Sequence, residues 1–204
     1  NGYQKNKFTY EYGKIRTANA QGVERIDYSY NNYNQRRDYS GLSSLYYGYK
    51  DHSINFNSLY INSNSNSFRE TDGYHFDYLD SIYTRRYTPT KRSLFVNQLM
   101  GVSKFNNFGI DWGVSYSKVK SVEDNRRQLV YLYDDGKYRI NDIDILDNHI
   151  FSSYLNETEL ATRLNLNYIL KKVRFDVGYD YKNKVRDFDY EQNIYDFNDA
   201  DLMN

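Results

Sequence analysis

Residues 160–181 carry the clearest alternation of apolar and polar side chains in the chain. Leu164 and Leu166 fall on one parity and Asn165 falls on the other, and the pattern restarts after two lysines at 171–172. Successive side chains of a strand point to opposite faces of a sheet, so this alternation predicts a β-hairpin with one apolar and one polar face. Each arm is about as long as a tilted strand that crosses a bilayer, which needs roughly 9–11 residues.

Other stretches repeat the same pattern and extend the prediction to a series of strands. The expected strands cover residues 7–12, 42–49, 53–62, 94–104, 108–118, 161–170 and 173–181, and sequence neighbours should pair antiparallel. The polar segments between them are expected to lie outside the sheet. We expect loops at residues 17–38 and 120–159, and either a long loop or a projecting hairpin at residues 69–92.

The spacing of the tight turns, near residues 51, 106 and 171, indicates an architecture. Strands of about ten residues use only part of each interval, so the remaining residues should form long connections at the opposite end of the sheet. Short turns at one end and long loops at the other are typical of bacterial outer-membrane barrels.

The two parities also predict which side chains would face lipid and which would face the lumen of such a barrel. The expected lipid-facing residues are Ile110, Trp112, Val114, Leu164, Leu166, Phe175 and Val177. The expected lumen-facing residues are Asp111, Ser115, Asn165 and Asp176. Small polar side chains dominate the second parity, which suits a lumen that packs against another domain.

The composition supports strands and excludes several classes of protein. The chain of 204 residues holds 25 Tyr and 11 Phe, and aromatic residues favour strands and membrane–water boundaries. No apolar run approaches the roughly 18 residues of a membrane helix. Lys+Arg and Asp+Glu both number 27, so the chain lacks the positive charge of a nucleic-acid-binding domain. The chain has no Cys and therefore no disulfide or Cys-ligated zinc.

Catalytic and cofactor motifs are missing from the sequence, so we do not expect an enzyme or a cofactor. His52, His75 and His149 lie far apart, and we expect them to be solvated histidines of turns and loops. The sequence has neither a Gly-rich phosphate loop nor a Gly-x-Ser-x-Gly elbow. The acidic residues at 134–147 offer oxygen ligands to a cation, but their spacing differs from that of an EF-hand. We favour a solvated loop there over a metal site.

Several motifs resemble the barrel of TonB-dependent outer-membrane transporters, with the SusC-like receptors as the nearest group. The resemblance depends on the order and spacing of these motifs over residues 42–181. The motifs are Phe56-Asn57-Ser58-Leu59-Tyr60, Gln98-Leu99-Met100-Gly101, Trp112 through Tyr116-Ser117, and Asn125-Arg126-Arg127-Gln128. The family commonly has Pro-Asp before the two arginines, where this chain has Asp124-Asn125.

The resemblance implies a fold, a location and a set of partners. Such transporters have a barrel of about 22 strands around a plugged lumen. Residues 1–204 would then be one partial β-barrel domain, all-β with antiparallel up-and-down strands, and the plug and remaining strands would lie outside this sequence. The protein would sit in the bacterial outer membrane and import a glycan, a peptide or a metal chelate. Its partners would be outer-membrane lipid, the plug, the rest of the barrel, TonB and a surface lipoprotein, and no nucleic acid.

Ligand capture is expected at the end that bears the long connections. The candidate ligand-binding residues are Tyr74, Tyr83, Arg85, Arg86, Arg126, Arg127, Tyr131 and Tyr133. Planar guanidinium groups beside tyrosines bind carboxylates, phosphates or sugar hydroxyls. The same arginines could instead pair with aspartates or with anionic outer-leaflet groups, and for any single arginine pair the sequence favours this structural role.

Two alternatives to an importer remain open at the level of sequence. A related barrel that has lost transport could act as a scaffold in an outer-membrane complex. A complete, soluble, lipocalin-like barrel could instead bind a ligand in its cavity. Sugars, peptides and metal chelates all fit aromatic and polar surfaces, so the sequence does not select a substrate.

Overall fold

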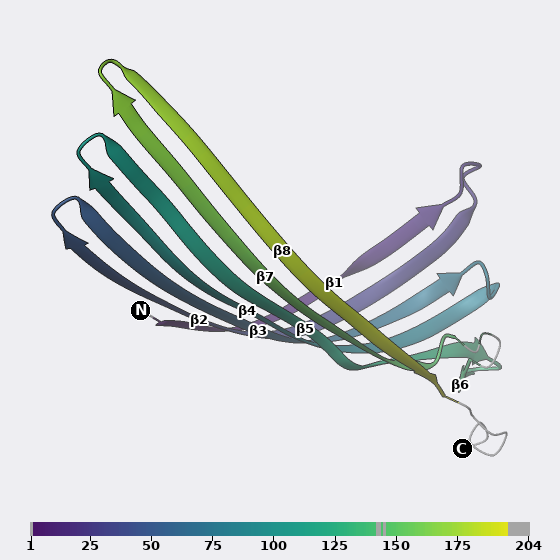
Figure 1. Cartoon of the computed structure of the whole chain (residues 1–204). Coiled ribbons are helices and arrows are strands. Elements are labelled where there is room, and N and C mark those ends of the chain that lie inside the picture. The colour runs from purple at the N-terminus through teal and green to yellow at the C-terminus, as the bar shows by residue number, and fades with distance from the viewer. Residues whose placement is uncertain (1, 142–143, 145, 196–204) are drawn as a thin grey trace.

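Strands of unusual length build nearly the whole molecule (Figure 1). The structure, a computed structural model, describes residues 2–141, 144 and 146–195. The strands are β1 (Gly2–Ala18), β2 (Glu24–Tyr49), β3 (His52–His75), β4 (Asp80–Phe105), β5 (Phe108–Asp134), β6 (Lys137–Ile140), β7 (His149–Leu170) and β8 (Val173–Ile194). They form one antiparallel sheet in the order β1-β2-β3-β4-β5-β7-β8, with β6 paired to β5.

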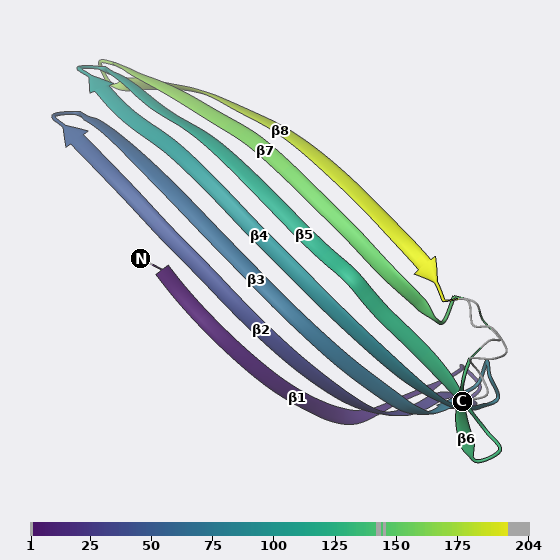
Figure 2. The ribbon, with the colours of Figure 1, turned by 90° about the horizontal axis from the view of Figure 1, so that it is seen from below.

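The sheet is open, twisted and curved like a trough (Figures 1 and 2). Every long strand pairs with its neighbour in sequence, which confirms the predicted all-β, up-and-down arrangement. β1 and β8 are the two outermost strands. Among the described residues, each of them pairs on one side only, so one backbone edge of each strand is left unpaired.

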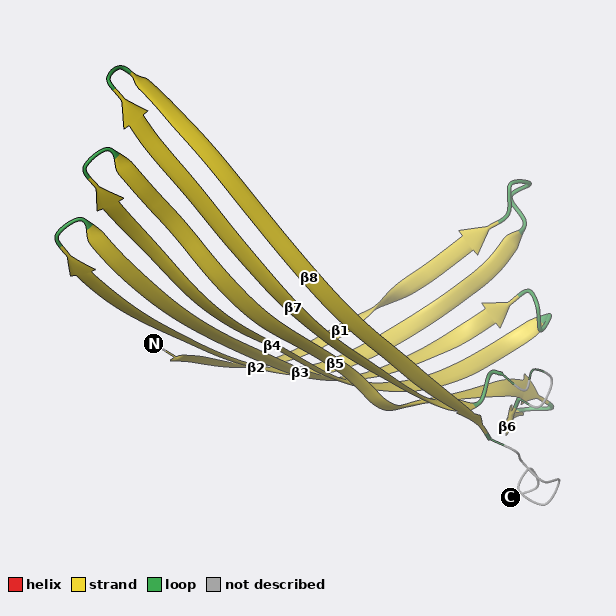
Figure 3. Cartoon of the chain, in the orientation of Figure 1, coloured by secondary structure: helices red, strands yellow, loops and turns green. Residues whose placement is uncertain are grey.

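The predicted strands lie at the right places but are too short, and the predicted loops at residues 17–38 and 120–159 are wrong. Strand structure runs through most of both segments, and residues 69–92 form the hairpin between β3 and β4 (Figure 3). Strands continue there because Tyr and Thr favour extended backbone. Short polar residues also bond across strands, as the Ser65 hydroxyl does to Asn34 Oδ1 over 2.8 Å.

The tight turns were predicted correctly, and they gather at one end of the sheet. Residues 50–51, 106–107 and 171–172 connect the hairpins there, whereas residues 19–23, 76–79 and the segment around β6 make the longer connections at the other end (Figure 1). Lys50, Asn106 and Lys171 open these turns with φ values of 50°, 49° and 55°. Asn tolerates this left-handed region, whereas the Lys positions cost about 1–2 kcal/mol each.

A β-bulge interrupts the middle of β5 and explains a proline inside the sheet. One extra residue near Asn125, whose φ is 57°, breaks the register with both β4 and β7. Pro89 lies at the matching break in β4. Proline has no N–H to donate, so a bulge is one of the few places in a sheet that accepts it. The Asn125 N–H donates instead to the Ser152 hydroxyl at 3.0 Å.

The sheet has almost no hydrophobic core of its own. Among the described hydrophobic residues only Ile82 and Val130 are buried, and both lie in the half of the sheet away from the tight turns. The described residues include no helix that could cross a membrane. A sheet this large with both faces open needs other material to cover it, since apolar surface left in water is unfavourable.

Candidate functional site

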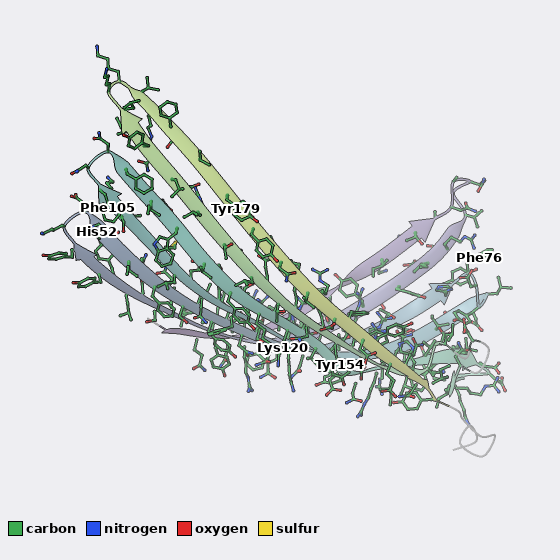
Figure 4. All side chains as sticks on the ribbon, in the orientation of Figure 1. His52, Phe76, Phe105, Lys120, Tyr154 and Tyr179 are labelled. Atoms are coloured by element: carbon green, nitrogen blue, oxygen red, sulfur yellow. The ribbon has the colours of Figure 1, made fainter. Side chains whose placement is uncertain are left out.

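The two faces of the sheet differ in chemistry, and the register fixes which side chains share a face. We call the face that carries Trp112, Lys120 and Tyr154 the outer face, because Figure 4 shows side chains projecting beneath the curved sheet near Lys120 and Tyr154. The opposite, hollow side, which carries Asp111 and Asn165, is the inner face.

An apolar band crosses the outer face in the half of the sheet nearest the tight turns. The register aligns Ile110 with Leu166 and Val177, and it aligns Trp112 with Leu164 and Tyr179. These rows therefore confirm that the predicted apolar set shares one face. The apolar band consists of Leu45, Tyr47, Ile54, Phe56, Leu99, Ile110, Trp112, Val114, Leu164, Leu166, Val177 and Tyr179.

Aromatic side chains border this apolar band on both sides. The row next to the tight turns is Tyr49, Phe105, Phe108, Tyr168 and Phe175. The row on the far side is Tyr60, Phe95, Tyr116 and Tyr181. All of these rings are exposed on the sheet, so no part of the described chain covers them.

The inner face opposite the apolar band is mostly small and polar. Asp111 lies opposite Asn165, which lies opposite Gly178, and a ladder of ion pairs continues along β7 and β8. In that ladder Lys184 Nζ is 2.7 Å from Glu157 Oε1. Two neighbouring apolar rows interrupt this polar surface, and Met100 and Val102 lie on the same face. The first row is Leu42, Leu59 and Val96, and the second is Ile61, Leu94 and Val119.

The eight candidate ligand-binding residues all lie beyond the apolar band, in the extension of the sheet away from the tight turns, and the structure divides them between the faces. Those on the outer face are Tyr74, Tyr83, Arg85, Arg127, Tyr131 and Tyr133. Those on the inner face are Arg86 and Arg126. Neighbouring arginines of a pair therefore point to opposite sides, because side chains alternate along a strand.

On the outer face, the predicted tyrosines form a cluster with acidic residues that sequence reasoning missed. The Tyr83 hydroxyl donates to Glu70, and Arg85 Nε lies 3.2 Å from the same carboxylate. The Tyr83 ring contacts the Tyr131 ring at 5.9 Å between centroids. Tyr138 lies against Tyr83 on the other side, at 5.5 Å. Arg85 is therefore already paired, as the structural interpretation of the arginines expects.

Tyr138 completes the outer cluster through a bond to β3. Its hydroxyl donates to Asp72 Oδ1 over 2.9 Å, which ties the β5–β6 hairpin to a strand that it does not pair with. Burial of the ring, and then the bond to Asp72, raise the pKa of Tyr138 to about 12. The arrangement is a network of aromatic rings and hydroxyls.

On the inner face, Arg69, which was not predicted as a site residue, joins the candidates Arg86 and Arg126. Arg69 lies directly opposite Arg86, and Arg86 lies directly opposite Gln128. Arg86 Nε donates to Gln128 Oε1 over 2.7 Å. Arg126 lies beside Glu123, with Nη1 at 3.2 Å from Oε1, and its guanidinium stacks over the Phe151 ring at 4.3 Å.

His149 fixes the position of Arg126 in this group. His149 Nδ1 lies 2.7 Å from the Leu146 carbonyl oxygen, which only accepts, so Nδ1 carries the proton. Nε2 is then free to accept from Arg126 Nη2 at 3.4 Å. His149 is only 8% exposed, which makes it part of the framework of the inner face and corrects the expectation of a solvated loop histidine.

A cavity of about 390 Å³ opens on the inner face beside the arginines. Arg69 and Arg86 line it with Thr71, Thr84 and Gln128, and the aromatic and acidic side of the same cavity contains Tyr28, His75, Tyr78 and Asp147. Burial, followed by the charges of Asp147 and Asp77, raises the pKa of Tyr28 to about 12. The Tyr78 hydroxyl donates to Asp147, so that carboxylate is engaged within the cavity wall.

The residues missed by sequence reasoning have one feature in common. Arg69, Glu70 and Asp72 lie in the segment predicted to be a long loop or a projecting hairpin, and Gln128 lies in a predicted loop. The sequence contains a weak strand pattern there, because the acidic residues Glu70 and Asp72 take one parity and Arg69 and Thr71 take the other, as side chains of a strand do. Only the register between strands, however, places Arg69 opposite Arg86.

The acidic stretch at residues 134–147 gives no metal site among the residues that the structure describes. Asp134 pairs with Arg139, and Asp147 accepts from Tyr78 and from Asn141 Nδ2, the latter over 2.5 Å. Asp142, one of the acidic residues of this stretch, lies outside the described residues.

A scan against models of known protein families and a search of curated proteins found no match to this chain.

Proposed function

We propose that this chain forms part of the transmembrane β-barrel of a TonB-dependent outer-membrane transporter that imports a glycan, a peptide or a metal chelate. One observation carries the proposal, namely the apolar band on the outer face with an aromatic row along each border. Outer-membrane barrels have an outward apolar band about 25 Å tall between two aromatic girdles.

The dimensions of the apolar band support a membrane. On β5 the band and its aromatic borders run from Phe108 to Tyr116. Nine residues at about 3.3 Å each extend roughly 30 Å along the strand, and a tilt of about 40° reduces this to roughly 23 Å. The band thus has about the height of the apolar zone of a bacterial outer-membrane barrel.

The two unpaired edges support a larger barrel. β1 and β8 would each present a long row of free N–H and C=O groups, and every residue of β8 is exposed. Such edges promote aggregation, and a barrel removes them by closure. Further strands of the same protein would therefore pair with β1 and β8. A small closed barrel of the lipocalin kind is not supported, because β1 and β8 do not pair with each other within the described residues.

The strands also extend well past the apolar band, and this extension gives the barrel an orientation. β4 has 26 residues, which corresponds to roughly 65 Å of height at a tilt of about 40°. With the tight turns in the periplasm, the extension with the outer tyrosine cluster and the inner arginines would stand outside the cell. The apolar row of Leu42, Leu59 and Val96 on the inner face offers a contact for a plug domain.

Cysteine labelling tests the location and orientation. The chain has no Cys, so Asp51→Cys in a tight turn and Asp77→Cys in the β3–β4 turn supply unique thiols in a full-length protein with no other cysteine. In intact cells, a membrane-impermeant maleimide should label position 77, and it should label position 51 only after the outer membrane is permeabilised. Recovery of the protein in the soluble fraction, or the reverse labelling pattern, would refute the proposal.

Uptake measurements separate a transporter from a scaffold. Cells with and without the full-length protein, each with and without functional TonB, are given labelled oligosaccharides, peptides and iron chelates. A transporter gives uptake of one class that requires both the protein and TonB. A scaffold leaves all uptake unchanged at equal surface abundance, and loss of the protein then disrupts an outer-membrane complex instead.

A further inference from the structure

We propose that Arg69 and Arg86 form an anion-binding site on the inner face of the sheet extension, and that this site takes a carboxylate or phosphate group of a soluble ligand. The inference goes beyond the proposed transport function, since it concerns the chemistry of one site and holds for a transporter or a scaffold. The geometry, the charge and the cavity each contribute to it.

The geometry leaves guanidinium donors without partners. Arg69 and Arg86 are direct cross-strand partners on β3 and β4. The Arg69 guanidinium stacks over the Tyr30 ring at 5.0 Å, and its Nε is buried with no hydrogen-bond partner in the described part of the protein. A buried donor without a partner is unfavourable, and an oxygen atom of a bound anion would satisfy it.

The charge around the pair is uncompensated. Two like charges directly opposite each other destabilise a sheet. Burial, and then the charges of Arg126 and Arg69, lower the pKa of Arg86, and the opposing effect of Glu123 is the smallest. Glu123 is already engaged by Arg126. A bound anion would neutralise the pair without any change in the fold.

The other acidic group near the pair is also occupied. Asp147 lines the same cavity, but it accepts hydrogen bonds from Tyr78 and Asn141. Arg86 donates to the neutral amide oxygen of Gln128, which leaves its positive charge unpaired by any carboxylate within ion-pair distance among the described residues. The arginine side of the cavity is therefore positive, and the acidic side is closed by its own hydrogen bonds.

The size and the lining of the cavity indicate which class of ligand fits it. Its volume of about 390 Å³ admits a small organic anion, and Thr71 and Thr84 bring hydroxyl groups to the same wall. Planar guanidinium groups bind the two oxygens of a carboxylate or phosphate in a forked arrangement. Because the site lies on the face opposite the apolar band, a solute inside the barrel would reach it, whereas the head group of a surrounding lipid would not.

Isothermal titration calorimetry on the full-length protein in neutral detergent tests the site, with citrate and inorganic phosphate as separate probes. The unmodified protein should bind at least one probe saturably, and added salt should weaken the binding. Arg69→Gln and Arg86→Gln should each weaken it about tenfold or more, because each removes charge-assisted hydrogen bonds. Arg86→Lys, which keeps the charge but not the fork, should give an intermediate loss.

Arg37→Gln is the matched control, because Arg37 is an exposed arginine on the outer face of β2, opposite Asn64 of β3, and is not among the candidate ligand-binding residues. Its affinity should equal that of the unmodified protein, and heat-modifiable migration on gels should show that every variant is folded. Absence of binding to both probes, or equal affinity in all folded variants, would overturn the proposal. Binding that occurs only to nanodiscs with anionic lipid, and equally in Arg86→Gln, would assign anion recognition to a lipid surface and also overturn it.

Discussion

Arginine placed in the centre of the apolar band should prevent the barrel from folding, and the same residue one position along the chain should not. Leu164 lies midway between Leu160 and Tyr168 on β7, and the register places it between Trp112 and Tyr179 on the outer face. Its neighbour in sequence, Asn165, points to the inner face. Leu164→Arg and Asn165→Arg therefore place one charge at the same height on opposite sides of the sheet.

The expected difference follows from this placement. Arginine on the lipid face costs about 2–4 kcal/mol at the bilayer midplane and less near the boundaries. Leu164 is at the middle of the apolar band, so we expect the full cost of about 2–4 kcal/mol for Leu164→Arg. This cost corresponds to a roughly 30- to 900-fold change in the folding equilibrium. Asn165 lies directly opposite Asp111, so an arginine there meets an acidic partner in a polar surface. We expect a change of about 0–1 kcal/mol for that variant.

The assay is reversible urea unfolding of the full-length protein in liposomes, followed by heat-modifiable migration on gels. Leu164→Arg should lower the free energy of unfolding by the stated amount or abolish insertion, while Asn165→Arg should fold as the unmodified protein does. Equal free energies for the two variants would refute the assignment of the outer face to lipid. A larger loss for Asn165→Arg would indicate that the inner face is the one in contact with the membrane.

Three further substitutions test details of the sheet. The indole of Trp112 occupies the space where a side chain at position 101 would lie, so Gly101→Val should displace it. The fluorescence emission of Trp112, the chain's single tryptophan, should then shift, and unchanged emission would contradict this packing. Gly73→Ala should lower the free energy of unfolding by about 1–3 kcal/mol, because φ is +145° there and the new Cβ would overlap the Asp27 carbonyl oxygen; a neutral effect in urea would argue against this backbone. Burial raises the pKa of Tyr28 to about 12, whereas the pKa of an unfolded tyrosine is about 10. The burial of the neutral Tyr28 hydroxyl therefore stabilises the fold fully below pH of about 10, and this stabilisation is lost as the pH rises through 12. The free energy of unfolding of Tyr28→Phe should therefore fall less between about pH 10 and pH 12 than that of the unmodified protein. Identical pH profiles of the two proteins in urea titrations would contradict the burial of this ring.

Sequence alone determined the class of fold and the positions of the tight turns. Alternation in 108–118 and 160–181 required strands with two chemically different faces, because side chains of a strand alternate strictly. The same rule assigned Trp112 and Leu164 to one face and Asp111 and Asn165 to the other, and the register agrees. Local pattern suffices for these features because they depend on residues close together in the chain.

The length of the strands was decided by pairing between strands. Residues 62–67 alternate Asn and Ser and have no apolar parity, so no sequence pattern predicts that a strand continues through them. In the structure these residues pair with β2 on one side and β4 on the other. Backbone hydrogen bonds to both neighbours, together with bonds such as that of Ser67 to Asn32, hold the segment extended without a hydrophobic face.

The candidate site depended on the tertiary structure even more strongly. Sequence identified arginine pairs as candidates, but Arg85 and Arg86 have different environments because they lie on opposite faces of one strand. Arg85 finds Glu70 on the outer face, whereas Arg86 meets Arg69 on the inner face. The charge surplus at Arg69 and Arg86 arises from the register of β3 against β4, and a shift of one residue would remove it.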